Sequence, residues 1–179
     1  GGVYFRSGVP TLEHSIIQDN VASTASDGRG GGLASHVARL TLEGNTVRRN
    51  IANTDPTRNG YGGGLYLYRV NSSVFRNTMV VDNRLTDSGD GSGMYLDEYA
   101  DLALLHTTLA RNTGGNGQGV YAESGSTIEM ANTIVVSHTV GVQASDTGTV
   151  VDLEATLWGS GAWANGFDAI PIGGGLVNA

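Results

Sequence analysis

One short pattern occurs six times along the chain: a glycine, an apolar residue and then, ten to fifteen residues later, a hydroxyl or amide residue, an apolar residue and Asn. The apolar residues that follow the glycines are Val3, Leu33, Leu65, Met94, Val120 and Val142, and they are separated by 30, 32, 29, 26 and 22 residues. A repeat whose length drifts while its ends stay recognisable is typical of stacked coils with loops of variable size.

Each repeat contains short segments in which apolar and polar residues alternate, which is the pattern of a β-strand. Leu33, Ser35 and Val37 show it best. Helical spacing is not sustained, because Gly or Asn interrupts every candidate window. We therefore expect an all-β fold, a right-handed parallel β-helix of about six to seven coils. Each coil has three short strands, two tight corners and one variable loop, and the handedness is the one that crossover connections favour.

Stacking places equivalent residues of successive coils in columns. One interior column is expected to contain the six apolar residues that follow the glycines. A second is expected to contain Ile17, Val47, Met79, Leu109, Ile134 and Leu157. A polar corner column is expected to contain Asn20, Asn50, Asp82, Asn112, Ser137 and Ser160, with side chains that bond from coil to coil. Thr46, Thr78, Thr108, Thr133 and Thr156 are expected to face outward.

The variable loops all fall between the corner column and the next glycines. They comprise residues 21–31, 51–62, 84–92 and 113–118. Stacking therefore predicts that these loops form a rim on one flank. We interpret residues 1–179 as a single β-helix domain and expect it to be a piece of a longer surface protein.

Composition and charge exclude several classes of function. The formal charge is −7, and all ten basic residues are arginine. A nucleic-acid surface needs clustered Lys and Arg, so no nucleic-acid partner is expected. No run approaches eighteen apolar residues, so we expect no transmembrane helix and no membrane insertion by this segment. The lack of cysteine excludes disulfides and thiolate metal sites.

Paired short motifs resemble those of a known family. Gly-Gly-apolar doublets begin at Gly1, Gly31 and Gly63, and apolar-x-x-Asn segments end at Asn20, Asn50 and Asn112. Together they resemble the Gly-Gly-apolar and Phe-x-x-Asn repeats of polymorphic outer membrane proteins and, more broadly, the pectate-lyase-like right-handed β-helix superfamily. Here Ile, Val or Leu replaces the typical Phe. The resemblance implies a passenger or stalk segment of a secreted or cell-surface bacterial protein.

The best candidate for a binding surface is the outer face of the strand that follows each glycine. One outward column is Tyr4, Ala34, Tyr66, Tyr95, Tyr121 and Gln143, and the next is Arg6, His36, Tyr68, Asp97, Glu123 and Ser145. Tyr66, Tyr95 and Tyr121, which we call the tyrosine strip, should form a contiguous aromatic surface overlooked by the loop rim, and its accessibility to solvent distinguishes a glycan-binding face from a passive stalk. Aromatic faces beside polar groups suit sugar rings. We therefore expect a non-enzymatic adhesin-like passenger or rigid spacer that binds a polysaccharide or cell-surface glycan through Tyr66, Tyr68, Tyr95, Asp97, Tyr121 and Glu123. Stacking of strand-forming tyrosines between coils is the simpler alternative.

An enzymatic alternative uses the two carboxylates of the same face. Asp97 and Glu123 should lie on neighbouring coils, at a separation near that of a retaining glycosidase. The alternative function is accordingly a polysaccharide lyase or glycoside hydrolase, with Glu123 as acid and Asp97 as nucleophile.

No cofactor and no metal site are expected. Residues 87–91 (Asp-Ser-Gly-Asp-Gly) could hold Ca²⁺ with loop oxygens, but they lack the bidentate Glu of a calcium loop, and a plain turn is the preferred interpretation.

Overall fold

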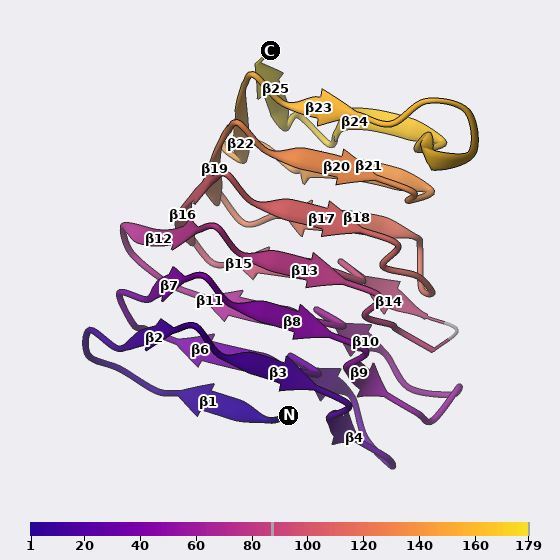
Figure 1. Cartoon of the computed structure of the whole chain (residues 1–179). Helices are drawn as coiled ribbons and strands as arrows, with labels where there is room; N and C mark the ends of the chain where they lie inside the picture. Colours follow the sequence, from indigo (N-terminus) through magenta and orange to yellow (C-terminus); the bar gives the residue numbers. More distant parts are fainter. Residues whose placement is uncertain (87, 179) are drawn as a thin grey trace.

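The computed structural model describes residues 1–86 and 88–178, which form short strands that stack in about six coils (Figure 1). All the strand pairs are parallel, and three sheets run along the solenoid. The first sheet contains β1 (Val3–Phe5), β6 (Leu33–His36), β11 (Leu65–Tyr68), β15 (Met94–Asp97), β18 (Gln118–Ala122), β21 (Val140–Ser145) and β24 (Phe167–Ile172). The predicted right-handed parallel β-helix is confirmed.

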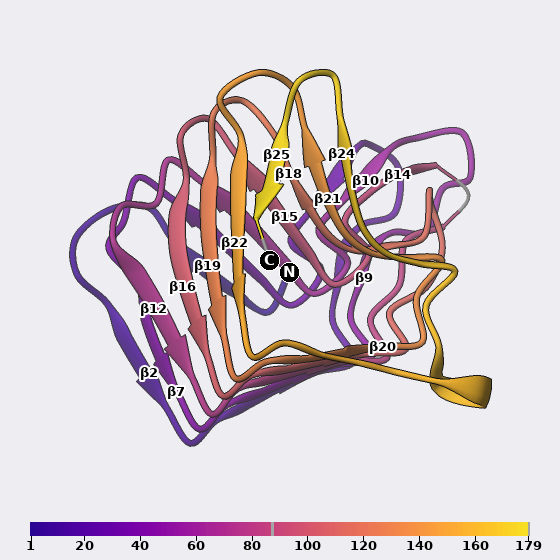
Figure 2. The same cartoon turned by 90° about the horizontal axis from the view of Figure 1, so that it is seen from above.

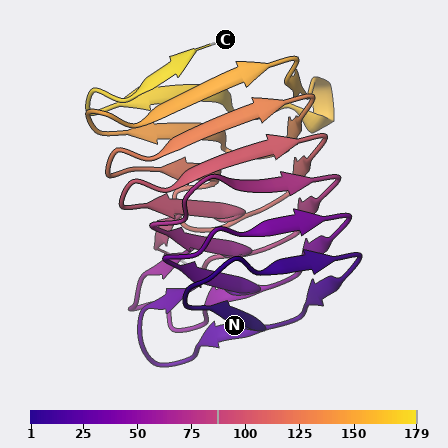
Figure 3. The same ribbon diagram turned by 90° about the vertical axis from the view of Figure 1, so that its left-hand side faces the viewer.

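The two other long sheets complete each coil, and the view along the side shows the coils one above another (Figure 3). The second sheet contains β2 (Thr11–Glu13), β7 (Thr41–Glu43), β12 (Ser73–Arg76), β16 (Asp101–Leu105), β19 (Thr127–Ala131), β22 (Val150–Glu154) and β25 (Leu176–Asn178). The third sheet contains β3 (Ile16–Gln18), β8 (Thr46–Arg48), β13 (Met79–Val81), β17 (Thr108–Ala110), β20 (Ile134–Val136) and β23 (Leu157–Trp158). A short 3₁₀ helix, η1 (Gly161–Trp163), follows β23.

The variable loops lie on one flank, beside the first sheet, and contain short strands of their own (Figure 2). One rim sheet contains β5 (Gly28–Arg29), β10 (Gly60–Tyr61) and β14 (Gly89–Asp90), and a second contains β4 (Val21–Ser23) and β9 (Ile51–Asn53). The rim is therefore an ordered layer, and it determines what part of the first sheet solvent can reach.

The first interior column is confirmed in full. Val3 pairs with Leu33, and the register continues through Leu65, Met94 and Val120 to Val142. These residues belong to one hydrophobic core that runs the length of the solenoid. Burying one such side chain contributes roughly 1.5–3 kcal/mol, so the column is a main source of stability.

The second interior column was predicted wrongly in three coils, each time by one residue. In the third coil Val80 is buried and Met79 is 45 % exposed. The shift places Asn83 at the buried corner and sends Asp82 outside, where its carboxylate binds Arg111 at 2.7 Å. With Met79 inside, a carboxylate would have been buried among amides, which is costly. The same shift places Val135 and Trp158 inward and Ile134 and Leu157 outward.

The corner column is a ladder of amides in a corrected register. It contains Asn20, Asn50, Asn83, Asn112, His138 and Asn165, whereas the prediction had Asp82, Ser137 and Ser160 at three of these corners. Asn50 Nδ2 donates to Asn83 Oδ1 at 3.0 Å, and Asn83 Nδ2 donates to Asn112 Oδ1 at 3.0 Å. The second amide hydrogen of Asn83 binds the carbonyl of Val47. We call these six side chains the amide ladder.

The amide ladder explains why glycine opens each repeat. A Cβ at Gly32 would lie 2.8 Å from Asn50 Nδ2, and a Cβ at Gly64 would lie 2.9 Å from Asn83 Nδ2. Only glycine leaves room for the amide of its own coil at this point. The Gly-apolar segment and the distant Asn are therefore two halves of one packing unit.

The predicted outward threonine column is only partly correct. Thr46 and Thr108 lie on the outer face of the third sheet, in register with exposed Met79. Thr78 and Thr133 are fully buried one residue earlier, at the corner. The register shift that moved the interior column moved these hydroxyls with it.

Ser35 is the one hydroxyl residue in the inner column between Phe5 and Leu67, and its buried Oγ has no hydrogen-bond partner. We expect Ser35→Ala to raise the free energy of unfolding by about 1 kcal/mol, because an unsatisfied buried hydroxyl is unfavourable. Urea denaturation measures this, with exposed Ser7→Ala as the matched control. A lower stability for Ser35→Ala would contradict the expectation.

Candidate functional site

The outward columns of the first sheet have the predicted register. Tyr66 pairs with Tyr95, and Tyr95 pairs with Tyr121. The ring centroids are 5.6 Å apart in the first pair and 5.2 Å in the second, with 24° between the ring planes in both. The tyrosine strip is therefore a continuous aromatic stack across three coils.

The tyrosine strip is largely closed to solvent, which favours stacking between coils over direct ligand contact by these three rings. Tyr66, Tyr95 and Tyr121 are 9 %, 5 % and 9 % exposed. The rim covers them: the ring of Tyr61 meets Tyr95 edge to face at 5.2 Å, and the Arg29 guanidinium lies 5.5 Å from the Tyr61 ring centre and 5.8 Å from that of Tyr66. The three rings act mainly as packing between the first sheet and the rim, and their role in binding stays a prediction.

The hydroxyl groups of the tyrosine strip fix the neighbouring polar side chains. Tyr66 Oη donates to Asp97 Oδ2 at 3.0 Å, and Tyr95 Oη donates to Glu123 Oε1. Burial and the adjacent carboxylate raise the pKa of Tyr95, and the same causes raise that of Tyr66, so both phenols stay protonated as donors. Asp97 and Glu123 are thereby held in place by groups that cannot rotate away.

Two adjoining hollows lie where the rim ends over the first sheet, and together we call them the cleft. One has a volume of about 200 Å³ and is lined by Arg29, Tyr61, Tyr66, Tyr95, Asp97 and Glu123. The other, of about 340 Å³, is lined by Arg29, His36, Tyr66, Tyr68 and Asp97. The rings of His36 and Tyr68 stack at 4.6 Å with 10° between their planes. The tyrosines of the cleft that stay partly exposed are Tyr61 and Tyr68, and the Arg69 guanidinium lies 5.3 Å from the centre of the Tyr68 ring.

The chain matches the family model described as the right-handed β-helix region over residues 1–156. It belongs to the right-handed β-helix family. No curated protein and no solved structure matches it. Within the described part of the chain, no helix is long and apolar enough to cross a membrane. Membership of this β-helix family accounts for the fold, and any activity has to be argued from the side chains of the site.

Asp97 and Glu123 lie on neighbouring coils and both line the first hollow of the cleft. Asp97 ends β15, and Glu123 follows β18, where its backbone N–H donates to the carbonyl of Leu96 at 3.1 Å. Burial raises the pKa of Glu123, and the neighbouring charge of Asp97 raises it further. The predicted neighbouring pair is therefore present. With Arg29 at the rim and His36 in the second hollow, the lining carries two carboxyl groups, one guanidinium and one imidazole.

Arg29 and Tyr61 were not singled out from the sequence. Both lie in the rim sheet, on β5 and β10, which pair in register. The signal was present: Gly28-Arg29-Gly30 and Gly60-Tyr61-Gly62 repeat one Gly-x-Gly unit just before successive glycine doublets. A repeat at equal distance from the glycines indicates that the loops also stack, and that their middle residues share a column.

Other candidate sites receive less support from the geometry. Asp87 of the suggested calcium loop lies outside the described residues, and Asp90 accepts hydrogen bonds from Asn116 and Gln118. The described residues contain no group of three metal-binding side chains. A larger hollow of about 550 Å³ lies beside the second sheet. Its described lining is aliphatic, acidic and amide, without an aromatic ring for a sugar.

Proposed function

We propose that this chain is a rigid, non-enzymatic segment of an extracellular or cell-surface bacterial protein, an adhesin-like passenger or spacer that binds carbohydrate in the cleft. The single observation that carries the proposal is the cleft itself. It places the half-buried rings of Tyr61 and Tyr68 beside fixed carboxylates and an arginine. Sugar-binding sites combine aromatic faces with a few positioned polar groups.

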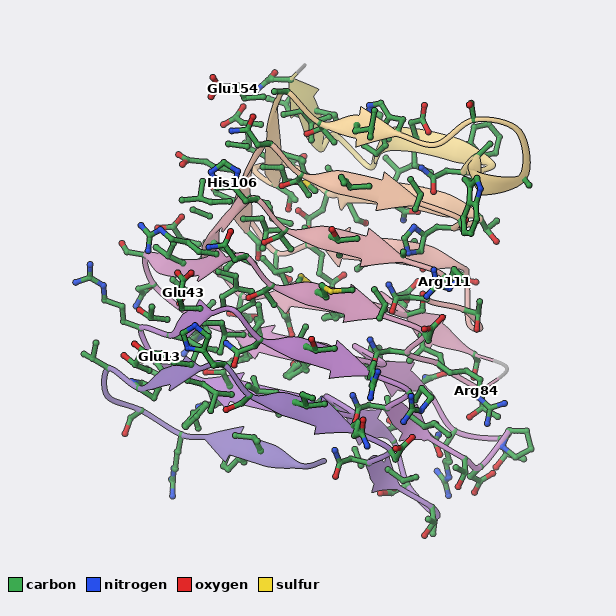
Figure 4. The ribbon with its side chains drawn as sticks, viewed as in Figure 1. Glu13, Glu43, Arg84, His106, Arg111 and Glu154 are labelled. Atoms are coloured by element: carbon green, nitrogen blue, oxygen red, sulfur yellow. The ribbon has the colours of Figure 1, made fainter. Side chains whose placement is uncertain are left out.

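The surroundings of the cleft support a binding surface that is already formed. Asp97 and Glu123 are held by tyrosine hydroxyls, and Arg29 lies against two rings. A preformed site loses little conformational entropy when a ligand binds, so a shallow cleft can still give useful affinity. The acidic side chains labelled Glu13, Glu43 and Glu154 lie far from the rim, at the opposite edge of the solenoid (Figure 4).

We expect Tyr68→Ala to weaken binding to a polysaccharide about tenfold, because loss of one stacking ring corresponds to roughly 1.4 kcal/mol. A glycan-array screen identifies a ligand, and calorimetry measures the change in Kd. Tyr4→Ala is the matched control, since Tyr4 lies in an outward column of the same sheet, 63 % exposed and outside the cleft. The proposal fails if no glycan binds, or if both variants bind like the unmodified protein.

A second candidate is a polysaccharide lyase or glycoside hydrolase that uses the same cleft. The observation in its favour is the raised pKa of Glu123 on the coil next to Asp97, since a higher pKa suits the carboxyl group that acts as acid in such a pair. We expect such an enzyme to release reducing sugar from a polysaccharide, and Asp97→Asn to lower the rate at least a hundredfold. If no plant or bacterial polysaccharide yields product, the enzymatic candidate is wrong and only the binding function remains.

A further inference from the structure

Each carboxylate of the cleft keeps an oxygen that can accept a hydrogen bond from a ligand. Tyr66 occupies only Oδ2 of Asp97, and Oδ1 has no protein donor among the described residues. Tyr95 occupies Oε1 of Glu123, and only a long 3.4 Å contact from Tyr121 reaches Oε2. The cleft thus offers two fixed carboxylate oxygens to a ligand that donates hydrogen bonds.

The carboxylates of the cleft are not neutralised by an ion pair. The three ion pairs among residues 1–86 and 88–178 join Arg49 to Asp19, Arg69 to Glu98 and Arg111 to Asp82. The guanidinium of Arg29 lies against Tyr61 and Tyr66 instead. Two carboxylates therefore face one guanidinium, and the second hollow adds the imidazole of His36. Since a half-buried site screens charges less than bulk water does, a cation is favoured there and an anion is disfavoured.

We infer that the cleft binds a glycan that carries protonated amino groups, in preference to neutral glycans and to uronates. An ammonium group supplies three donors, which match the free oxygens of Asp97 and Glu123. A uronate would bring a third carboxylate into the same space. This inference rests on the proposed carbohydrate-binding function and names its ligand class.

Calorimetry at pH 6 and low salt tests the inference with four hexasaccharides, those of glucosamine, N-acetylglucosamine, glucose and galacturonate. We expect the glucosamine hexamer to bind at least tenfold more tightly than the glucose hexamer, and the galacturonate hexamer to bind most weakly. Asp97→Asn and Glu123→Gln should each narrow the ratio between glucosamine and glucose, and 0.5 M NaCl should narrow it too. Glu129→Gln, an exposed carboxylate of the second sheet, is the control and should leave the ratio unchanged.

The outcomes separate the inference from the function on which it rests. If the glucose or galacturonate hexamer binds as tightly as the glucosamine hexamer, the inference is wrong while carbohydrate binding stands. If none of the four binds, both are wrong. A hexalysine peptide that binds as tightly as the glucosamine hexamer would show recognition of charge alone, and would overturn the assignment to a glycan.

Discussion

Asn83→Ala is expected to lower the free energy of unfolding by about 4 kcal/mol, because each buried group left without a partner costs roughly 1–3 kcal/mol. Asn83 is fully buried. Its Oδ1 accepts from the backbone N–H and the side chain of Asn50, and its Nδ2 donates to Val47 and Asn112. The substitution breaks all four hydrogen bonds in the middle of the amide ladder.

Urea denaturation followed by circular dichroism measures the effect of Asn83→Ala. The matched control is Asn71→Ala, at an exposed corner of the second sheet, where the change should stay within about 0.5 kcal/mol. Equal stabilities for the two variants would mean that the amide ladder is not a main support of the fold. A selective loss at Asn83 would identify the corner amides as the element that holds successive coils in register.

The amide ladder also shows why the sequence predicted the fold but misplaced some residues. The β-helix is predicted by the repeat itself, which is recognisable even when the residues of one coil are aligned with the next coil one position out of register. Within the third coil, however, Met79, Val80 and Val81 are all apolar, so hydrophobicity cannot decide which of them points inward. The corner that follows the strand determines that Val80 points inward. At this corner Asn83, three residues after Val80, forms hydrogen bonds with buried backbone groups as donor and acceptor, which the carboxylate of Asp82 cannot do. Matching polar corners before apolar strands would have given the correct register.

The tyrosine strip illustrates a different limit. Sequence periodicity correctly placed Tyr66, Tyr95 and Tyr121 outside the β-helix interior, but outside the interior does not mean open to solvent. The rim covers the strip through Arg29 and Tyr61, which belong to loops of irregular length. The candidate cleft therefore depends on contacts between loop and sheet, and no periodicity within a strand encodes them.

Acid is expected to destabilise this protein through His138, which takes the place of an asparagine in the amide ladder. Asn112 Nδ2 lies 3.1 Å from His138 Nε2, and the buried Nδ1 has no partner. Burial lowers the pKa of His138 to about 4, below its ordinary value of 6.5. Above pH 6.5 neither the folded nor the unfolded state binds this proton. Between pH 6.5 and 4 the unfolded state is more protonated at His138 than the folded state. The free energy of unfolding therefore decreases as the pH is lowered through this range, by about 3 kcal/mol in total.

His138→Asn should remove this acid sensitivity, because an amide at the same corner can receive the Asn112 side chain and cannot be protonated in this pH range. Urea denaturation at pH 7, 6, 5 and 4 should give curves that diverge below pH 6.5, with the variant the more stable at pH 4. Parallel curves would contradict the assignment, and so would a His138 ring signal that titrates near 6.5 in the folded state. His106→Asn is the control, since His106 lies at an outward corner of the solenoid (Figure 4). If only His138→Asn removes the loss of stability at low pH, a single corner of the amide ladder determines how far the pH can fall before the whole solenoid is destabilised.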